Sequence, residues 1–162
     1  MEEVLIDTNT VEKARKKAFE MGELNNSITR GQGSLAGFVG EEVVRELLDG
    51  VEKNTYDYDL LSKTGKKVEV KTKRTGYTPK DYYECSIAKY NTKQKCDYYV
   101  FVRVHNDLTK AWILGCYPKE NYLKNSKALK KGDVDPSNNF TVKADCYNMA
   151  IKDLYNMETV DG

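Results

Sequence analysis

A polar–apolar alternation on both sides of a glycine-bearing turn constrains this chain more than any other feature of its sequence. It spans residues 56–73, which read YDYDLLSKTGKKVEVKTK. Alternation that continues through a turn with glycine is typical of a β-hairpin. We therefore predict two antiparallel strands joined at the turn Lys63-Thr64-Gly65.

The length of this turn decides which side chains share a face of the hairpin. A three-residue loop with Gly65 in the left-handed conformation places Asp59 opposite Glu69. A two-residue loop would instead place Asp59 opposite Val70 and put the carboxylates on different faces. With the longer loop, side chains that alternate at period two bring four charged residues to one face. These residues are Asp57, Asp59, Glu69 and Lys71.

Two interpretations of this charged face are open. It can be a solvated surface whose cross-strand ion pairs contribute little. It can also be a site where a divalent cation and an attacking water meet. Apolar neighbours favour the second interpretation, because carboxylates near a core are costly unless they are paired or bound to metal. The neighbours are Leu60, Leu61, Val68 and Val70.

Residues 34–48 are predicted to form a helix that begins at Ser34 and stops at Gly50. Its apolar residues recur at helical spacing; they are Leu35, Val39, Val43 and Leu47. Gly37 and Gly40 each cost about 1 kcal/mol relative to alanine inside a helix. We expect that they are tolerated because the helix closely approaches another backbone.

Two glutamates, Glu41 and Glu42, lie in the middle of this predicted helix. An amphipathic helix turns such residues toward water, and we favour that interpretation for Glu42 and for Glu46.

Three segments together resemble the motifs of a nuclease superfamily. They are GFVGE ending at Glu41, DLL beginning at Asp59 and VEVK at 68–71. In this order and spacing they resemble the PD-(D/E)XK superfamily, which includes restriction endonucleases, archaeal Holliday-junction resolvases and small phage endonucleases. The resemblance covers residues 34–75, with weaker similarity at 97–116. Tyr58 replaces the proline of the motif, which leaves Asp57 as an alternative to Asp59.

The resemblance implies a restriction-endonuclease-like α/β fold, with a mixed central sheet flanked by helices, in a single domain over residues 1–162. It implies that Asp59 and Glu69 ligate Mg²⁺, with Mn²⁺ as a substitute, and that Glu41 is an outer metal ligand. Lys71 would position or activate the water. These residue types suit the chemistry, because Mg²⁺ prefers oxygen ligands and takes one or two protein carboxylates.

Basic residues cluster in the sequence around this motif, although the net charge is only +1. They are Lys63, Lys66, Lys67, Lys71, Lys73, Arg74 and Lys80. We interpret Lys66, Lys73 and Arg74 as phosphate contacts, together with Arg30 in the polar loop 25–33. Ordinary solubilising charge, and for the loop a plain connector, are the alternatives.

The remaining composition limits the class of protein. A length of 162 residues suits one core. No apolar run has the length of a membrane span, and the start lacks a basic signal-peptide region. Four widely spaced cysteines and a single histidine argue against a zinc site and for a reducing, cytoplasmic compartment.

Further elements are predicted from local patterns. Thr8 or Thr10 caps a first helix, and Pro118 opens a short helix that continues to Leu123. Strands are expected at 98–104, 111–116 and 140–144, with a terminal helix around Leu154. Residues 75–95 fit a helix and an edge strand equally, and we assign neither.

The function predicted from the sequence is a Mg²⁺-dependent DNA endonuclease that recognises DNA structure, as the resolvases do. A homodimer is implied by the resemblance alone. One alternative is a sequence-specific restriction or repair nuclease, and another is a non-catalytic nucleic-acid-binding protein of the same fold.

Overall fold

The structure, a computed structural model, describes residues 1–25 and 35–162. The helices in these ranges are α1 (Thr8–Asn25), α2 (Leu35–Leu47) and α3 (Lys119–Asn125). The strands are β1 (Glu2–Leu5), β2 (Val51–Glu52), β3 (Leu60–Leu61), β4 (Lys67–Thr75), β5 (Glu84–Ala88), β6 (Tyr98–His105), β7 (Lys110–Pro118), β8 (Lys127–Leu129) and β9 (Cys146–Ala150). Short 3₁₀ turns are η2 (Lys89–Lys93), η3 (Ile151–Asp153) and η4 (Met157–Thr159).

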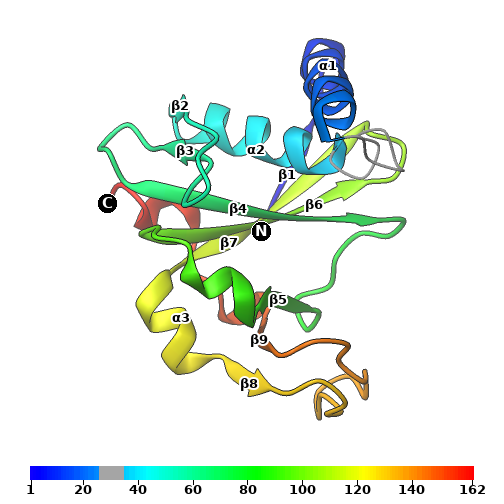
Figure 1. Ribbon diagram of the computed structural model, residues 1–162, viewed down its shortest axis with the longest axis vertical. Coiled ribbons are helices and arrows are strands. Elements are labelled where there is room, and N and C mark those ends of the chain that lie inside the picture. Colours follow the sequence, from blue (N-terminus) through cyan, green and yellow to red (C-terminus); the bar gives the residue numbers. More distant parts are fainter. Residues whose placement is uncertain (26–34) are drawn as a thin grey trace.

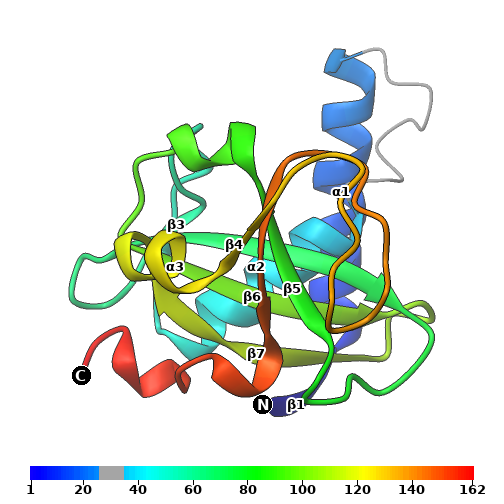
Figure 2. The same ribbon diagram turned by 90° about the horizontal axis from the view of Figure 1, so that it is seen from below.

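Two sheets organise the chain. The larger is six-stranded, in the order β1-β7-β6-β4-β3-β2, and the smaller is three-stranded, in the order β5-β9-β8. Only the β4–β6 pair is parallel among the described strands. Helices α1 and α2 cover one face of the larger sheet, while α3 and the smaller sheet lie on its other side (Figure 1; Figure 2). The predicted class, a mixed α/β sheet flanked by helices, is confirmed.

A hydrophobic core lies on each side of the larger sheet, and β6 supplies side chains to both. Val100, Val102 and Val104 pack toward α1 and α2. Tyr99 and Phe101 pack toward the smaller sheet and α3. Burial on both faces explains why β6 reads as a nearly continuous apolar run, as in the central strands of layered α/β folds.

The hairpin has the predicted three-residue loop. Leu60 pairs with Val68, and Gly65 has a φ of +86°, the left-handed conformation that this loop requires. Strand β3 is short, so β4 continues to Thr75 with β6 as its remaining strand partner. Among the described strands, none pairs with the other backbone edge of β4 beyond Val68.

Helix α2 approaches β4 closely at Gly40 and not at Gly37, but Gly40 meets a side chain and not the backbone that was expected. A Cβ atom at Gly40 would clash with Thr72 Oγ1 of β4, whereas no described atom lies within 4 Å of one at Gly37. The buried face at the C-terminal end of α2 also differs from the prediction. Leu47 is 40 % exposed, and Leu48 is the buried residue at that end.

The cap predicted for α1 is wrong by one residue. Asp7 precedes the helix, and its Oδ1 accepts the backbone N–H of Thr10 at 2.8 Å. Aspartate is as good an N-cap as threonine, so composition alone did not decide between neighbouring positions. The predicted N-cap Ser34 lies outside the described residues.

Several predictions in the second half of the chain are corrected. Residues 140–144 are not a strand; β9 follows them at Cys146–Ala150. The terminal segment forms the 3₁₀ turns η3 and η4 in place of an α-helix, and Pro118 lies just before α3. The undecided segment 75–95 contains β5 and η2.

All four cysteines are free, as predicted. None of the described helices is both long and apolar enough to cross a membrane.

Candidate active site

Three carboxylates from separate elements meet where β3 leaves β4. Glu41 comes from α2, Asp59 directly precedes β3, and Glu69 lies on β4. Asp59 Oδ2 accepts the backbone N–H of Val70 at 2.8 Å, so the aspartate occupies the free edge of β4. The local fold explains this meeting, because the glycine at position 40 lets α2 approach β4 closely.

The carboxyl group of Asp59 lies between the other two and interacts with both. The pKa of Glu69 is raised to about 8, mainly by burial and then by the adjacent Asp59, against the opposing charge of Lys71. Burial also raises the pKa of Asp59 to about 6, with the charge of Glu41 adding to the effect and a hydrogen bond from Glu69 opposing it. The pKa of Glu41 is raised by burial as well. Near neutral pH these shifts favour one proton held between the carboxyl groups of Asp59 and Glu69.

Lys71 lies at this cluster, as predicted. Its Nζ donates to Glu69 Oε2 at 3.1 Å and to Gln94 Oε1 at 3.2 Å. Gln94 in turn donates from Nε2 to the backbone oxygen of Tyr56 at 2.8 Å, which ties the loop before β3 to the lysine. Sequence reasoning missed Gln94, because it falls in the segment where helix and strand signals conflict.

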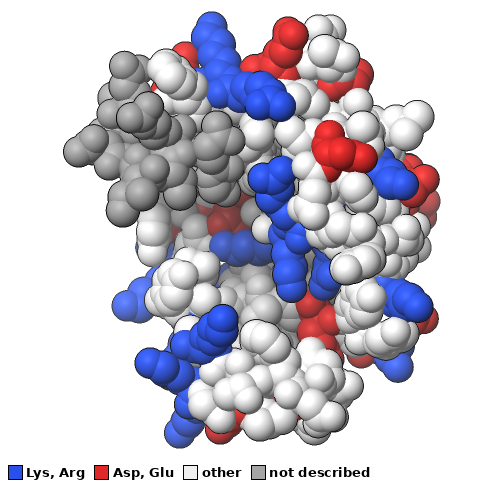
Figure 3. Space-filling view, turned by 90° about the vertical axis from the view of Figure 1, so that its right-hand side faces the viewer, with Lys and Arg blue, Asp and Glu red and all other residues white. Residues whose placement is uncertain are grey.

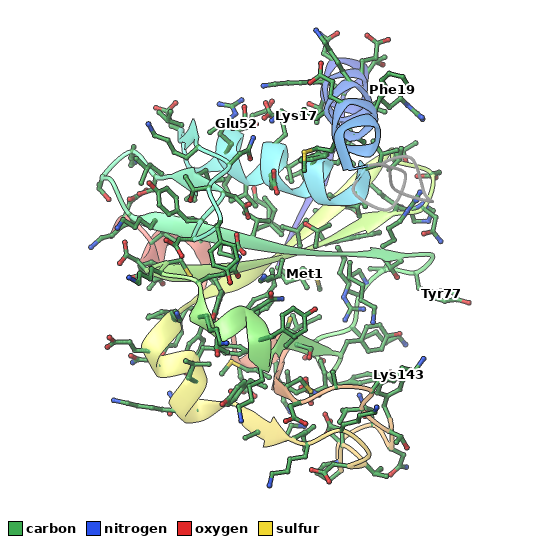
Figure 4. All side chains as sticks on the ribbon, in the orientation of Figure 1. Met1, Lys17, Phe19, Glu52, Tyr77 and Lys143 are labelled. Carbon is green, nitrogen blue, oxygen red and sulfur yellow. The ribbon has the colours of Figure 1, made fainter. Side chains whose placement is uncertain are left out.

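A second lysine, Lys17 of α1, lies on the other side of the cluster. It forms an ion pair with Glu52 of β2, and Figure 4 shows the two side chains near one another above α2. The charge of Lys17 also lowers the pKa of Glu41, although less than burial raises it. Nothing in the sequence placed Lys17 here, since α1 and α2 pack through tertiary contacts only.

The two aspartates of the hairpin have different surroundings. Asp57 Oδ1 accepts the backbone N–H of Lys95 at 3.1 Å and so holds the loop after η2. Asp59 is the one that touches the other carboxylates. The geometry favours Asp59 over Asp57 as the site residue.

The prediction that Glu42 is solvated is wrong. Its side chain is 11 % exposed and pairs with Arg45 at 2.6 Å and with Lys13 at 3.3 Å. Although burial acts to raise it, these two cations hold the pKa of Glu42 below its ordinary value. Glu46 is exposed, as predicted. The two neighbouring glutamates therefore differ sharply: Glu42 is neutralised within α2, and Glu41 faces the other acids.

A divalent cation is the group that the sequence implied, and the donor set fits it in part. Within residues 1–25 and 35–162, no three or more His, Cys, Asp and Glu side chains are arranged as a ready metal-binding group. Mg²⁺ nevertheless needs only one or two protein carboxylates, because it keeps several waters. Asp59, which is half-buried, and Glu69, which is buried, supply two adjacent oxygen donors whose raised pKa values a cation would reverse.

The predicted phosphate contacts are distributed over two places. Lys66 lies at the hairpin turn, where its N–H donates to Ser62 Oγ. Lys73 and Arg74 lie at the far end of β4, and Arg74 donates to the backbone oxygen of Asn106 at 3.0 Å. Arg30 lies outside the described residues. Lys and Arg side chains gather around a hollow on this side of the molecule (Figure 3).

Comparison with known proteins assigns this chain to no family. Neither the protein-family models nor the curated protein sequences include a match to this chain.

Proposed function

We propose that this protein is a metal-dependent endonuclease that hydrolyses phosphodiester bonds in DNA on a restriction-endonuclease-like fold. One observation carries the proposal: the buried Glu69 lies against the half-buried Asp59, beside Lys71, at an edge of β4 that no described strand covers beyond Val68. Strongly perturbed carboxylates with a specific charged partner are typical of functional sites. A purely structural hairpin gains nothing from placing such acids together.

Asp59 and Glu69 would hold Mg²⁺ or Mn²⁺ directly, with Glu41 next to them as an outer partner. The bound cation would lower the pKa of a water and stabilise negative charge on the phosphate. The ammonium of Lys71, already oriented by Gln94, would donate to the attacking water or to a phosphoryl oxygen. Lys17 would offset the negative charge of the cluster on the side of Glu41.

Lys73 and Arg74 extend the positive charge along β4, away from the acids. Each lysine or arginine that neutralises a phosphate releases counterions, so binding should weaken with salt. Replacing Lys73 or Arg74 with alanine should lower DNA affinity and flatten its salt dependence. The roles of Lys66 and Arg30, and the homodimer implied by the resemblance, remain predictions.

A non-catalytic nucleic-acid-binding protein is the second candidate. The cationic residues on the hollowed side of the molecule favour it independently of the acids (Figure 3). The two candidates differ in the need for metal, because a binding protein has no use for Asp59 beside Glu69.

The test is cleavage of labelled duplex, flap and four-way-junction DNA with Mg²⁺, comparing wild type with Asp59→Asn and Glu69→Gln. We expect both variants to lose activity by more than about 100-fold while remaining folded, as removal of a key electrostatic group does. Glu46→Gln is the matched control, because Glu46 is exposed on the same helix as Glu41. Wild-type cleavage in either cluster variant, or none by wild type on any substrate with Mg²⁺ or Mn²⁺, would refute the nuclease proposal.

A further inference from the structure

A cleft of about 920 Å³ separates the end of β4 and β6 from the smaller sheet. Its walls include Lys73, Arg74 and Arg103 from the larger sheet and Asn148 from the smaller one. The volume lies at the upper end of the range typical of ligand sites, about 300–1,000 Å³. The acids of the candidate active site do not line it, so the cleft is a separate feature that needs its own explanation.

Arg103 is the most informative residue in this cleft. It lies on β6, is only 7 % exposed, and donates from Nη2 to the backbone oxygen of Glu84 at 3.1 Å. Its guanidinium lies 5.3 Å from the centre of the Tyr83 ring. No carboxylate among the described residues is within ion-pair distance of it.

An unpaired buried cation is costly, and here burial lowers the pKa of Arg103. A guanidinium has five N–H donors in a planar fork, which matches two oxygens of a phosphate. The arrangement is therefore that of an anion site which no carboxylate in the described part of the chain fills.

Further cations surround the same opening. Lys73 of β4 lies opposite Arg103 of β6 in the register of the two strands. Lys143, in the loop before β9, lines the same cleft. Tyr77 and Lys143 project to the same side of the molecule, from above and below the cleft (Figure 4). The acid in the wall, Glu84, is neutralised by Lys127 at 2.8 Å, so the cleft carries a net positive charge.

Aromatic side chains also line this cleft and are unusually exposed. The exposed fractions are 76 % for Tyr77, 59 % for Tyr82 and 54 % for Phe140. Such rings form platforms on which bases of any sequence can stack. In a duplex the base faces are already stacked, so these rings suit unpaired bases.

Two buried acceptors complete the wall. Glu84 Oε2 and Asn148 Oδ1 have no hydrogen-bond partner among the described residues, and Asn148 is 5 % exposed. The amide of Asn148 is fixed because its Nδ2 donates to Asp135 Oδ2 at 2.9 Å. Both oxygens are fully buried, so they lie behind the surface of the cleft and add polarity to its wall without contacting a bound base.

The cleft is continuous with the candidate active site along β4. Lys71 and Lys73 are two residues apart and so share a face of the strand. Both line a smaller cavity of about 280 Å³ that also includes Arg103. A ligand chain that extends from Lys71 along β4 would therefore meet Lys73 and Arg103 next.

We propose that the cleft binds a single-stranded segment of DNA, with Arg103 on a phosphate and the aromatic rings on its bases. The proposal rests on the proposed function in one respect: the bound strand is taken to continue into the nuclease site. The substrate class is then DNA with an unpaired strand, such as a flap, and not a fully paired duplex.

The test measures binding without metal, by fluorescence anisotropy of a short labelled single strand and of a hairpin duplex of the same sequence, in EDTA. We expect the single strand to bind more tightly than the duplex. Arg103→Gln should lower the single-strand affinity by about 10-fold or more, because it removes both the charge that contacts the phosphate and the cation stacked on Tyr83. Because Arg103 is buried, the exposed variants Tyr77→Ala and Tyr82→Ala provide a second test with no effect expected on folding. Arg15→Gln is the matched control, because Arg15 is exposed on α1 away from the cleft.

Equal affinity for the two DNAs, or unchanged single-strand affinity in Arg103→Gln and in both tyrosine variants, would overturn the proposal. Failure of the proposed nuclease gives a different result. In that case single-strand binding and its loss in the variants persist, but no DNA is cut when Mg²⁺ is added.

Discussion

The adjacent carboxyl groups of Asp59 and Glu69 should affect the stability of the protein in a way that can be measured without a substrate. Glu69 is 4 % exposed, and burial followed by contact with Asp59 raises its pKa to about 8, against an ordinary value of 4.5. In the unfolded chain this carboxyl ionises freely above pH 4.5. In the metal-free folded protein it retains its proton up to about pH 8.

The raised pKa determines how the stability of the protein changes with pH. Stability from this group is fully present below about pH 4.5 and is lost progressively as the pH rises toward 8. At about pH 7 the gap is about 2.5 pH units, which corresponds to about 3 kcal/mol at 1.36 kcal/mol per unit. Glutamine cannot ionise, yet it can still accept from Lys71 and donate to Asp59. Allowing for weaker contacts, we expect Glu69→Gln to stabilise the metal-free protein by about 2 kcal/mol at pH 7.

Thermal unfolding in EDTA at several pH values measures this effect. For a domain of this size, about 2 kcal/mol corresponds to a rise in Tm of roughly 4–8 °C. The gain should vanish near pH 4.5, and Glu46→Gln should show no comparable change. Mg²⁺ should reverse the order, because a cation held by Asp59 and Glu69 stabilises the wild type more. If Glu69→Gln is less stable than wild type at pH 7 in EDTA, the description of Glu69 as a strained, protonated acid is wrong.

Three further predictions concern neighbouring residues. Glu41→Gln should impair cleavage far more than Glu42→Gln, because only Glu41 faces the acids; the reverse order in a cleavage assay would show that the wrong glutamate was chosen. Lys71→Ala should lose most single-turnover cleavage but little DNA affinity, and normal cutting would exclude lysine assistance. Gly40→Ala should lower the free energy of unfolding by about 1–3 kcal/mol through overpacking, whereas Gly37→Ala should raise it by up to about 1 kcal/mol; equal effects in denaturant titrations would contradict the close approach of α2.

The candidate site could be predicted from sequence because its central part is local. The turn length alone fixed the pairing of Asp59 with Glu69, and period-two alternation then put Lys71 on the same face. Glu41 required the resemblance as well as the helix pattern. Lys17 and Gln94 could not be found, because both reach the site through packing between elements that are distant in the chain.

The cleft was not predictable for a related reason. Its wall joins β6 to the segment after β4 and to the loop before β9, and local signals failed in both of the latter. Arg103 falls within the strand predicted at 98–104, and nothing in that pattern distinguishes it as a binding residue. Only the three-dimensional arrangement shows that no described carboxylate forms an ion pair with it.

The parallel β4–β6 pair links the two sites by a fixed spacing. Glu69 and Lys73 are four residues apart on one face of β4, which at about 3.3 Å per residue separates their Cα atoms by about 13 Å. Lys73 is paired with Arg103, so the same spacing separates the acids from the start of the cleft. A stacked DNA strand covers this distance with about four nucleotides, at 3.4 Å each, and an extended strand with fewer.

If both proposals hold, the cut should fall within about four nucleotides of the point where a flap becomes single-stranded, because β4 and β6 leave no freedom to change the distance. Mapping the cut on a labelled flap with its junction shifted one nucleotide at a time measures this directly: a cut that follows the junction supports one continuous path for the strand, and a cut that stays at a fixed sequence contradicts it.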